Sequence, residues 1–195
     1  TYGNIFGYIK YDSYDNKYFP SNGWFFSGNP QFYMFSSEKA EVFSPFFIVS
    51  SEAGIAKTVF KNATVKLQAE AGITFGEKTI PYFDYFLGGY GFSNTNNLKY
   101  FYGYDFLSIS GNSYLETTIT FDYEVFRKNH INFSANYANL NDNLYQSLDW
   151  ISLPKYSGYA LGYGLETIIG PVEMKYSWSP EISHSYLWFS VGFVF

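Results

Sequence analysis

Apolar and polar residues alternate over several long stretches of this chain. In residues 64–75 every second position is apolar, and the positions between them are largely polar. The apolar set is Val65, Leu67, Ala69, Ala71, Ile73 and Phe75, and the polar set is Lys66, Gln68, Glu70 and Thr74. Because successive side chains of a β-strand point to opposite faces, this pattern predicts a strand with one apolar and one polar face.

The same alternation recurs along the chain and predicts nine strands. They cover residues 5–12, 24–35, 42–60, 64–75, 113–126, 131–140, 159–167, 172–178 and 187–195. Pro30 predicts a bulge or weak pairing in the second strand, and Pro45 predicts an irregular start to the third. Two long segments, 76–112 and 141–156, lack clear alternation, and loops of that length are usually functional or disordered.

The final nine residues place five bulky apolar side chains on one face. The five are Leu187, Phe189, Val191, Phe193 and Phe195. Such a face would be core in a soluble sandwich and would meet lipid in a membrane barrel. A terminal Phe on this kind of strand resembles the C-terminal signal of bacterial outer-membrane barrels, which the barrel assembly machinery reads. We therefore predict that these five residues form an assembly signal.

Composition favours the membrane alternative. Aromatic residues make up 24% of the 195 residues and charged residues 15%, against about a quarter charged in soluble domains. No stretch approaches the roughly 18 uncharged apolar residues of a membrane helix, whereas a barrel strand needs an apolar residue only at every second position. We predict an all-β, transmembrane, antiparallel up-and-down β-barrel, one domain over residues 1–195, in the outer membrane of a Gram-negative bacterium.

The strand count leaves the size of the barrel open. A closed antiparallel barrel with both ends in the periplasm needs an even number of strands. Either residues 5–12 do not span, which leaves about eight strands, or the chain is the C-terminal half of a sixteen-stranded barrel. The second alternative requires a missing N-terminal half or a second copy as a partner. Segment 76–112 is then a long loop that is extracellular or folded into the lumen.

Little in the chain suggests catalysis. There are no cysteines, and the net charge of −5 argues against nucleic acid as a partner. His130 and His184 are expected at the surface on opposite sides of the membrane, so we expect no metal site, no cofactor and no catalytic residue. No Gly-x-Ser-x-Gly motif is present, which makes a membrane lipase the weakest alternative.

Charged residues in the predicted strands should point into the lumen, because charge facing lipid costs about 2–4 kcal/mol at the bilayer midplane. These residues are Lys66, Glu116, Asp122, Glu124, Glu166, Glu173 and Lys175. We expect them to satisfy one another in a filled lumen. The alternative, an ion path, needs a wider barrel.

Six segments, taken in order, resemble the C-terminal barrel half of the BamA/TamA/FhaC superfamily, the eighty-five-kilodalton Omp or bacterial surface antigen family. They are residues 11–23 (YDSYDNKYFPSNG), 81–89 (PYFDYFLGG), 101–104 (FYGY), 162–164 (GYG), 170–172 (GPV) and the terminal strand. Within this superfamily, the general residue pattern of the chain is most similar to barrels that are fused to patatin-like phospholipases and to forms without periplasmic domains. The resemblance implies a non-enzymatic role in inserting or translocating outer-membrane components, or in anchoring a partner domain. A structural or adhesive barrel without transport is the alternative.

One motif departs from the family pattern. Phe101, Tyr102, Gly103 and Tyr104 stand where the family carries Val-Arg-Gly-Phe/Tyr. In the family, the Arg enters the lumen and meets acidic groups on the next two strands, which correspond here to Asp122 and Asn136. With Tyr102 in place of the Arg, the resemblance implies a neutral hydrogen-bond network among these three residues. The loop is then a lid that stabilises the barrel or a gate that moves, and the missing Arg favours the lid.

Overall fold

Strands make up most of the chain. The computed structural model describes residues 1–37, 43–76, 81–91, 97–142 and 144–192. The long strands are β3 (Asn22–Ser36), β4 (Phe46–Phe60), β5 (Ala63–Phe75), β9 (Ser113–Phe126), β10 (Asn129–Asn141), β11 (Tyr156–Thr167), β12 (Gly170–Trp178) and β13 (Ser185–Val191). The short elements are β1 (Tyr2–Phe6), β2 (Ile9–Asp12), β6 (Tyr85–Leu87), β7 (Leu98–Lys99), β8 (Ile109–Gly111) and the 3₁₀ turns η1 (Pro81–Phe83) and η2 (Asp149–Ile151). No helix within the described ranges is long and apolar enough to cross a membrane.

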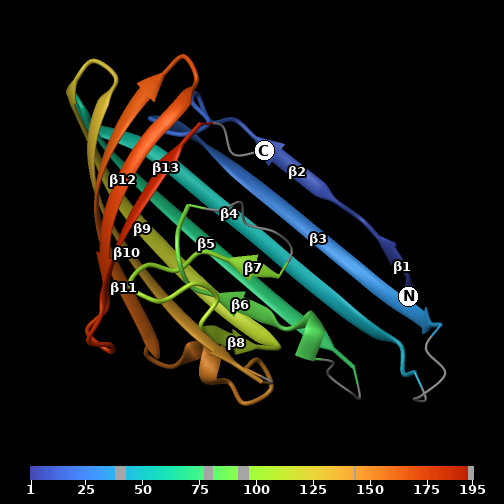
Figure 1. The fold of residues 1–195 in the computed structure, drawn as a ribbon. Helices are drawn as coiled ribbons and strands as arrows, with labels where there is room; N and C mark the ends of the chain where they lie inside the picture. The colour runs from blue at the N-terminus through green and yellow to red at the C-terminus, as the bar shows by residue number, and fades with distance from the viewer. Residues whose placement is uncertain (38–42, 77–80, 92–96, 143, 193–195) are drawn as a thin grey trace.

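Ten of the strands form one curved antiparallel sheet (Figure 1). The order is β1-β3-β4-β5-β9-β10-β11-β12-β13, and β2 also pairs with β3, so the ten strands occupy nine positions. Each long strand pairs with its neighbours along the chain, which confirms the predicted all-β, antiparallel up-and-down architecture. Within the described residues, the edge formed by β1 and β2 is not hydrogen-bonded to the edge formed by β13.

The first sheet position is interrupted, with two short strands where one was expected over residues 5–12. The interruption lies opposite Pro30 of β3, which has no backbone N–H to donate. Gly7, between β1 and β2, donates its N–H to the Pro30 carbonyl at 2.9 Å. Pro30 stays in register with Val49 of β4. The weak pairing predicted at Pro30 therefore falls on the β1/β2 side of β3.

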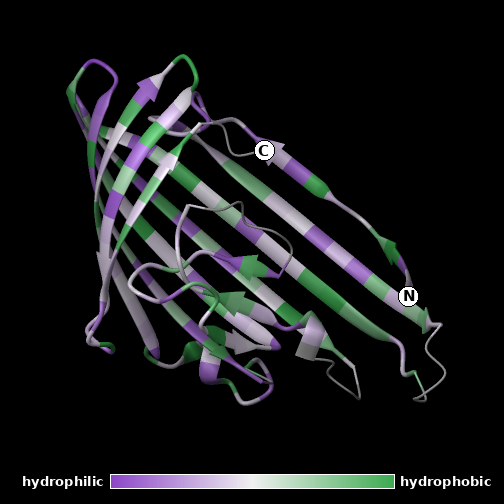
Figure 2. Cartoon of the chain, in the orientation of Figure 1, coloured by the Kyte–Doolittle hydropathy of each residue, from purple (hydrophilic) through white to green (hydrophobic). Residues whose placement is uncertain are grey.

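Alternation gives the sheet two different faces, visible as alternating bands along the strands in Figure 2. On the convex face, Leu67, Phe121 and Leu161 are 43%, 53% and 52% exposed. On the concave face, polar side chains such as Glu116 and Asn132 are buried. The convex face is the one that lipid covers, because apolar side chains stabilise the protein there and charges do not.

The two ends of the long strands differ somewhat from the predicted bounds. β4 begins at Phe46, directly after Pro45, and residue 42 lies outside the described residues. In β13, Leu187, Phe189 and Val191 are all exposed on the convex face. Phe193 and Phe195 lie outside the described residues, and the assembly signal stays a prediction.

A charge on the convex face should weaken the barrel. We expect Leu161→Lys to lower the free energy of unfolding by about 2–4 kcal/mol, because its ammonium would enter the hydrocarbon. Urea unfolding of vesicle-inserted protein measures this change. Leu153→Lys is the matched control, because Leu153 is 90% exposed and lies in the loop between β10 and β11. Equal losses in both variants would contradict the assigned lipid face.

Candidate functional site

The segment between β5 and β9 folds over the concave face of the sheet (Figure 1). Its strands form a small sheet in which β6 pairs in parallel with β7 and antiparallel with β8. Tyr85, Leu87 and Phe101 are fully buried there, with 0% exposure. Tyr85 donates its hydroxyl hydrogen to the Val49 carbonyl of β4 at 3.1 Å. The core of this small sheet therefore packs against the concave face, while Tyr82 and Phe106 of the same segment are exposed.

The motif Phe101, Tyr102, Gly103 and Tyr104 rests directly on the inner wall. With its amide oriented to satisfy both neighbours, Asn136 accepts from the Tyr102 backbone N–H at 3.0 Å and donates to the Gly158 carbonyl at 3.1 Å. A Cβ on Gly158 would lie 2.0 Å from the Tyr102 carbonyl oxygen. Gly103, with φ +78°, packs against the backbone of Trp178 and Ser179. Close backbone contact, made possible by two glycines, thus holds the motif.

The Tyr102 side chain meets a cation that comes from the wall. Lys175 of β12 donates from Nζ to the Tyr102 hydroxyl at 3.1 Å. The same ammonium lies 4.4 Å from the ring centroid of Tyr90, another loop residue. Tyr90 in turn donates to Glu173 Oε2 at 2.7 Å. Lys175 is 6% exposed, so these contacts act in a poorly solvated site, where they are stronger than in water.

The loop also carries its own cation into the lumen. Lys99 of β7 lies 3.2 Å from Glu70 of β5, and both side chains are buried. Glu70 stands in register between Glu52 of β4 and Glu116 of β9, so three carboxylates form one row across the wall. Lys99 is the one charged residue between Asp84 and Asp105. That isolated charge is the signal by which the sequence could have indicated this partner.

These contacts correct the neutral network expected for the loop motif. Asn136 does meet Tyr102, through the backbone, but Asp122 pairs with His130 instead: its Oδ2 lies 2.7 Å from His130 Nδ1. None of the hydrogen bonds that the structure describes joins Asp122 to the loop motif. The loop is instead held by two lysines, Lys99 and Lys175, because the row of glutamates and the buried tyrosines provide acceptors for both.

A second segment enters the concave face from the opposite end. In the turn between β2 and β3, the Phe19 ring stacks on the His130 imidazole, with centroids 4.2 Å apart and planes at 12°. Asn16 Nδ2 donates to Glu166 Oε1 at 3.0 Å. Gly164 leaves room for this docking, since a Cβ there would lie 2.5 Å from the Phe19 ring. His130 is only 6% exposed, so the expectation of a surface histidine is wrong.

Asp15 shapes this turn. Its Oδ1 accepts from the backbone N–H of Ser21 at 2.8 Å and of Asn22 at 3.1 Å. Burial alone would raise the pKa of the Asp15 carboxyl, but these hydrogen bonds and one from the Ser21 hydroxyl hold that pKa below its ordinary value of 3.8. Asp15 therefore remains ionised at neutral pH and keeps the turn closed on the lumen.

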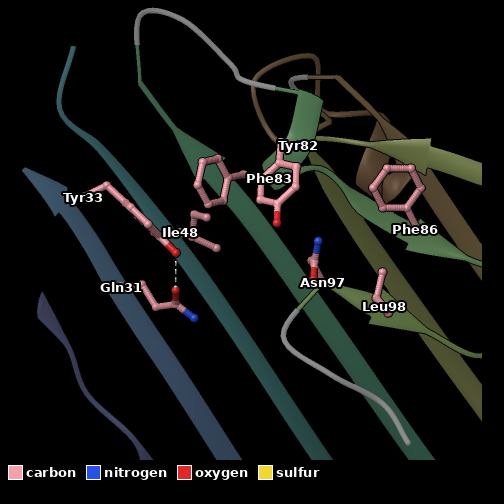
Figure 3. A pocket seen from close by; sticks show the side chains of 8 residues that line it. All are labelled: Gln31, Tyr33, Ile48, Tyr82, Phe83, Phe86, Asn97 and Leu98. Atoms are coloured by element: carbon pink, nitrogen blue, oxygen red, sulfur yellow. Dashed lines mark hydrogen bonds between the residues drawn. The ribbon is translucent and has the colours of Figure 1, made fainter. Parts of the chain in front are cut away.

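Aromatic packing fixes the entry of the loop near β3 and β4. Tyr33 and Phe46 stack with ring centroids 4.7 Å apart, and Phe83 of η1 lies 4.7 Å from Tyr33 and 5.1 Å from Phe46. An open pocket of about 490 Å³ lies beside this cluster (Figure 3). It is lined by Gln31, Tyr33, Ile48, Tyr82, Phe83, Phe86, Asn97 and Leu98. The Tyr33 hydroxyl donates to Gln31 Oε1 at 2.9 Å, which leaves a mainly apolar lining.

Other kinds of site receive no support from the geometry. In the part of the chain that the structure describes, no three His, Cys, Asp or Glu side chains are arranged to hold a metal ion. His184 is exposed beside β13, far along the chain from the buried His130 cluster. The concave face is therefore characterised by two docked segments and the charges that hold them.

Comparison with known proteins identifies the family. A family model described as the OMP85 superfamily matches residues 1–195. The chain belongs to the OMP85 superfamily. Membership confirms the resemblance inferred from the six motifs and places the chain among outer-membrane β-barrels.

A solved OMP85-type barrel shares the fold. The chain is similar to the crystal structure of BamA from Haemophilus ducreyi lacking POTRA domains 1–3, with a TM-score of 0.70 and 14% sequence identity. The match covers 95% of this chain and 40% of that chain, so this sheet spans less than half the length of that protein. At such low identity the likeness concerns the fold alone. Among curated proteins, none matches this chain.

Docking of the segment between β5 and β9 should depend on the absence of a side chain at Gly158. We expect Gly158→Ala to release the loop, because a methyl group would overlap the Tyr102 carbonyl. Heat resistance of the folded band on gels should fall, and proteolysis within the loop should accelerate. Gly28→Ala is the control, because its Cβ would meet only the Phe26 ring at an ordinary 3.7 Å. Identical behaviour of the two variants would contradict the docking.

Removing the loop cation should cost more than a surface ion pair does. We expect Lys99→Met to destabilise the protein by about 3–5 kcal/mol, because it leaves buried carboxylates without their cation. Adding Glu70→Gln should recover part of this loss, since one carboxylate is then neutral. Denaturant unfolding of both variants measures the two values. A loss below about 1 kcal/mol would instead be typical of an exposed pair.

Proposed function

We propose that this chain forms the C-terminal part of an outer-membrane barrel that helps insert or translocate outer-membrane components in a Gram-negative bacterium. Membership of the OMP85 superfamily supports this proposal. So does the loop docked on the inner wall through Tyr102, Lys99 and Lys175. The bilayer and the barrel assembly machinery are its proposed partners, the latter through the terminal strand.

The observation that carries the proposal is the pair of sheet edges, β1/β2 and β13, which are not hydrogen-bonded to each other within the described residues. Strand edges within a bilayer must have their backbone groups paired, so we propose that further strands complete the β1/β2 and β13 edges. Those strands come from an N-terminal half or from a second copy.

A folding assay tests this function. The full-length protein that contains this chain is reconstituted in vesicles, and an unfolded outer-membrane barrel is added as the client. We expect the client's folded band to accumulate several-fold faster than in empty vesicles. Gly158→Ala should reduce the acceleration if the docked loop contributes, and Gly28→Ala should retain it. Client folding no faster than in empty vesicles would refute the insertion role.

The filled concave face favours a second candidate, a barrel that anchors a partner domain and transports nothing. Two segments already occupy this face, and Lys99, Tyr102 and Asn16 of these segments are bonded to residues of the wall. An anchor predicts no acceleration of client folding and no change between the two glycine variants. The same assay therefore separates the two functions. A structural or adhesive barrel gives the same result as an anchor, and loss of surface attachment on deletion of the gene would single out adhesion.

A further inference from the structure

A polar cavity of about 270 Å³ remains between the two docked segments. The turn contributes Lys17 to Pro20, and the loop contributes Tyr90, Tyr100 and Tyr102. The wall of β5, β9, β10 and β12 closes the rest. The cavity is thus bounded by three parts of the chain that are far apart in sequence, and anything bound in it would contact all three.

Lys66 of β5 provides this cavity with a cation that forms no ion pair within the described residues. The four ion pairs there involve Lys10, Lys99 and His130, and none involves Lys66. No hydrogen bond of its ammonium is described either. Two carboxylates also line the cavity: Asp122 is paired with His130, and Glu173 accepts a hydrogen bond from the uncharged Tyr90 hydroxyl.

Gln68 provides an independent sign of an unfilled site. It occupies the next inward position of β5, lines the same cavity and is only 8% exposed. Its amide makes no hydrogen bond within the part of the chain that the structure describes. An inward-facing amide without a protein partner calls for an explanation in a native structure. Lys66 and Gln68 together present up to five N–H donors toward one space.

We propose that this cavity binds a phosphate group, with Lys66, Gln68 and Lys175 as its donors. Water could fill the volume and satisfy the amide, but it would give Lys66 no direct ion pair. A phosphate supplies negative charge and several acceptor oxygens, which suits two lysines and an amide better than a single carboxylate does. Lys175 already holds the loop through Tyr102, so a bound phosphate ties the loop to β5 across the lumen.

This binding does not depend on the insertion role, and two sources of phosphate are open to it. The ligand is either a soluble phosphate or the headgroup of a phospholipid that reaches the lumen. Inorganic phosphate in a phosphate-free detergent represents the first source. Phosphatidylglycerol added to the same micelles, at the same phosphorus concentration, represents the second. Sodium chloride at equal ionic strength is the reference, because it screens charges without offering oxygen acceptors.

The test is the melting temperature of the full-length protein. At a probe concentration 100-fold above its dissociation constant, the melting temperature should rise by several degrees over the chloride reference. Lys66→Gln should abolish this response, Lys66→Arg should preserve it, and Gln68→Leu should weaken it several-fold. Lys61→Gln, in the exposed turn between β4 and β5, should respond like the parent protein.

Each outcome decides the proposal. A response to inorganic phosphate or to phosphatidylglycerol that is lost in Lys66→Gln supports it and identifies the source. No response to either probe, or an equal response in Lys66→Gln, overturns it. Without added phosphate, Lys66→Gln should melt no lower than the parent protein, because it removes a half-buried charge that forms no ion pair. The client-folding assay on the same preparation keeps the two proposals separate: acceleration without a phosphate response refutes only the binding site, and the reverse refutes only the insertion role.

Discussion

The whole architecture depends on one constraint: backbone N–H and C=O groups inside the hydrocarbon layer must be hydrogen-bonded within the protein. A continuous antiparallel ladder from β3 to β13 meets this requirement across the sheet. The constraint also shows where the sheet is weakest. Pro30 cannot donate, and the strand beside it is broken into β1 and β2. At the other edge, β13 has no partner on its outer side within the described residues. Both edges are the places where we propose that further strands complete the barrel.

Other segments of the chain must then cover the polar face of this sheet, and the charges on that face determine which side chains pack against it. Strands in register bring Glu52, Glu70 and Glu116 into one row, an arrangement that is costly without a cation. Lys99 of the loop supplies one. At the other end, Phe19 and Asn16 close over His130 and Glu166. The two docked segments are therefore electrostatic and steric partners of the wall, and the cavity between them contains Lys66, which forms no ion pair within the described residues.

The replacement of the family's loop arginine does not make the lumen neutral. Tyr102 accepts a hydrogen bond from Lys175. At this position the cation therefore belongs to the wall and not to the loop motif, and the contact is still charge-assisted. Lys99 adds a second anchor three residues before Tyr102. The loop is thus held at two points of opposite polarity: its own cation meets a wall carboxylate, and its own hydroxyl meets a wall cation. Release of the loop requires both contacts to break, together with the backbone contact of Tyr102 with Asn136.

The sequence by itself determined the fold class, the positions of the eight long strands and the inward direction of the charged residues, because alternation with a period of two is local and a lipid-facing charge is excluded. It did not predict β6, β7 and β8, which lie in a segment without alternation. The order of the six motifs was sufficient to identify the family. Only the tertiary structure decided which charges meet. Asp122 was expected beside Tyr102 but pairs with His130, and Lys99 reaches Glu70 from 29 positions away along the chain. Such partners depend on strand register and on how deeply the loop and the turn enter the lumen, and no local pattern encodes either.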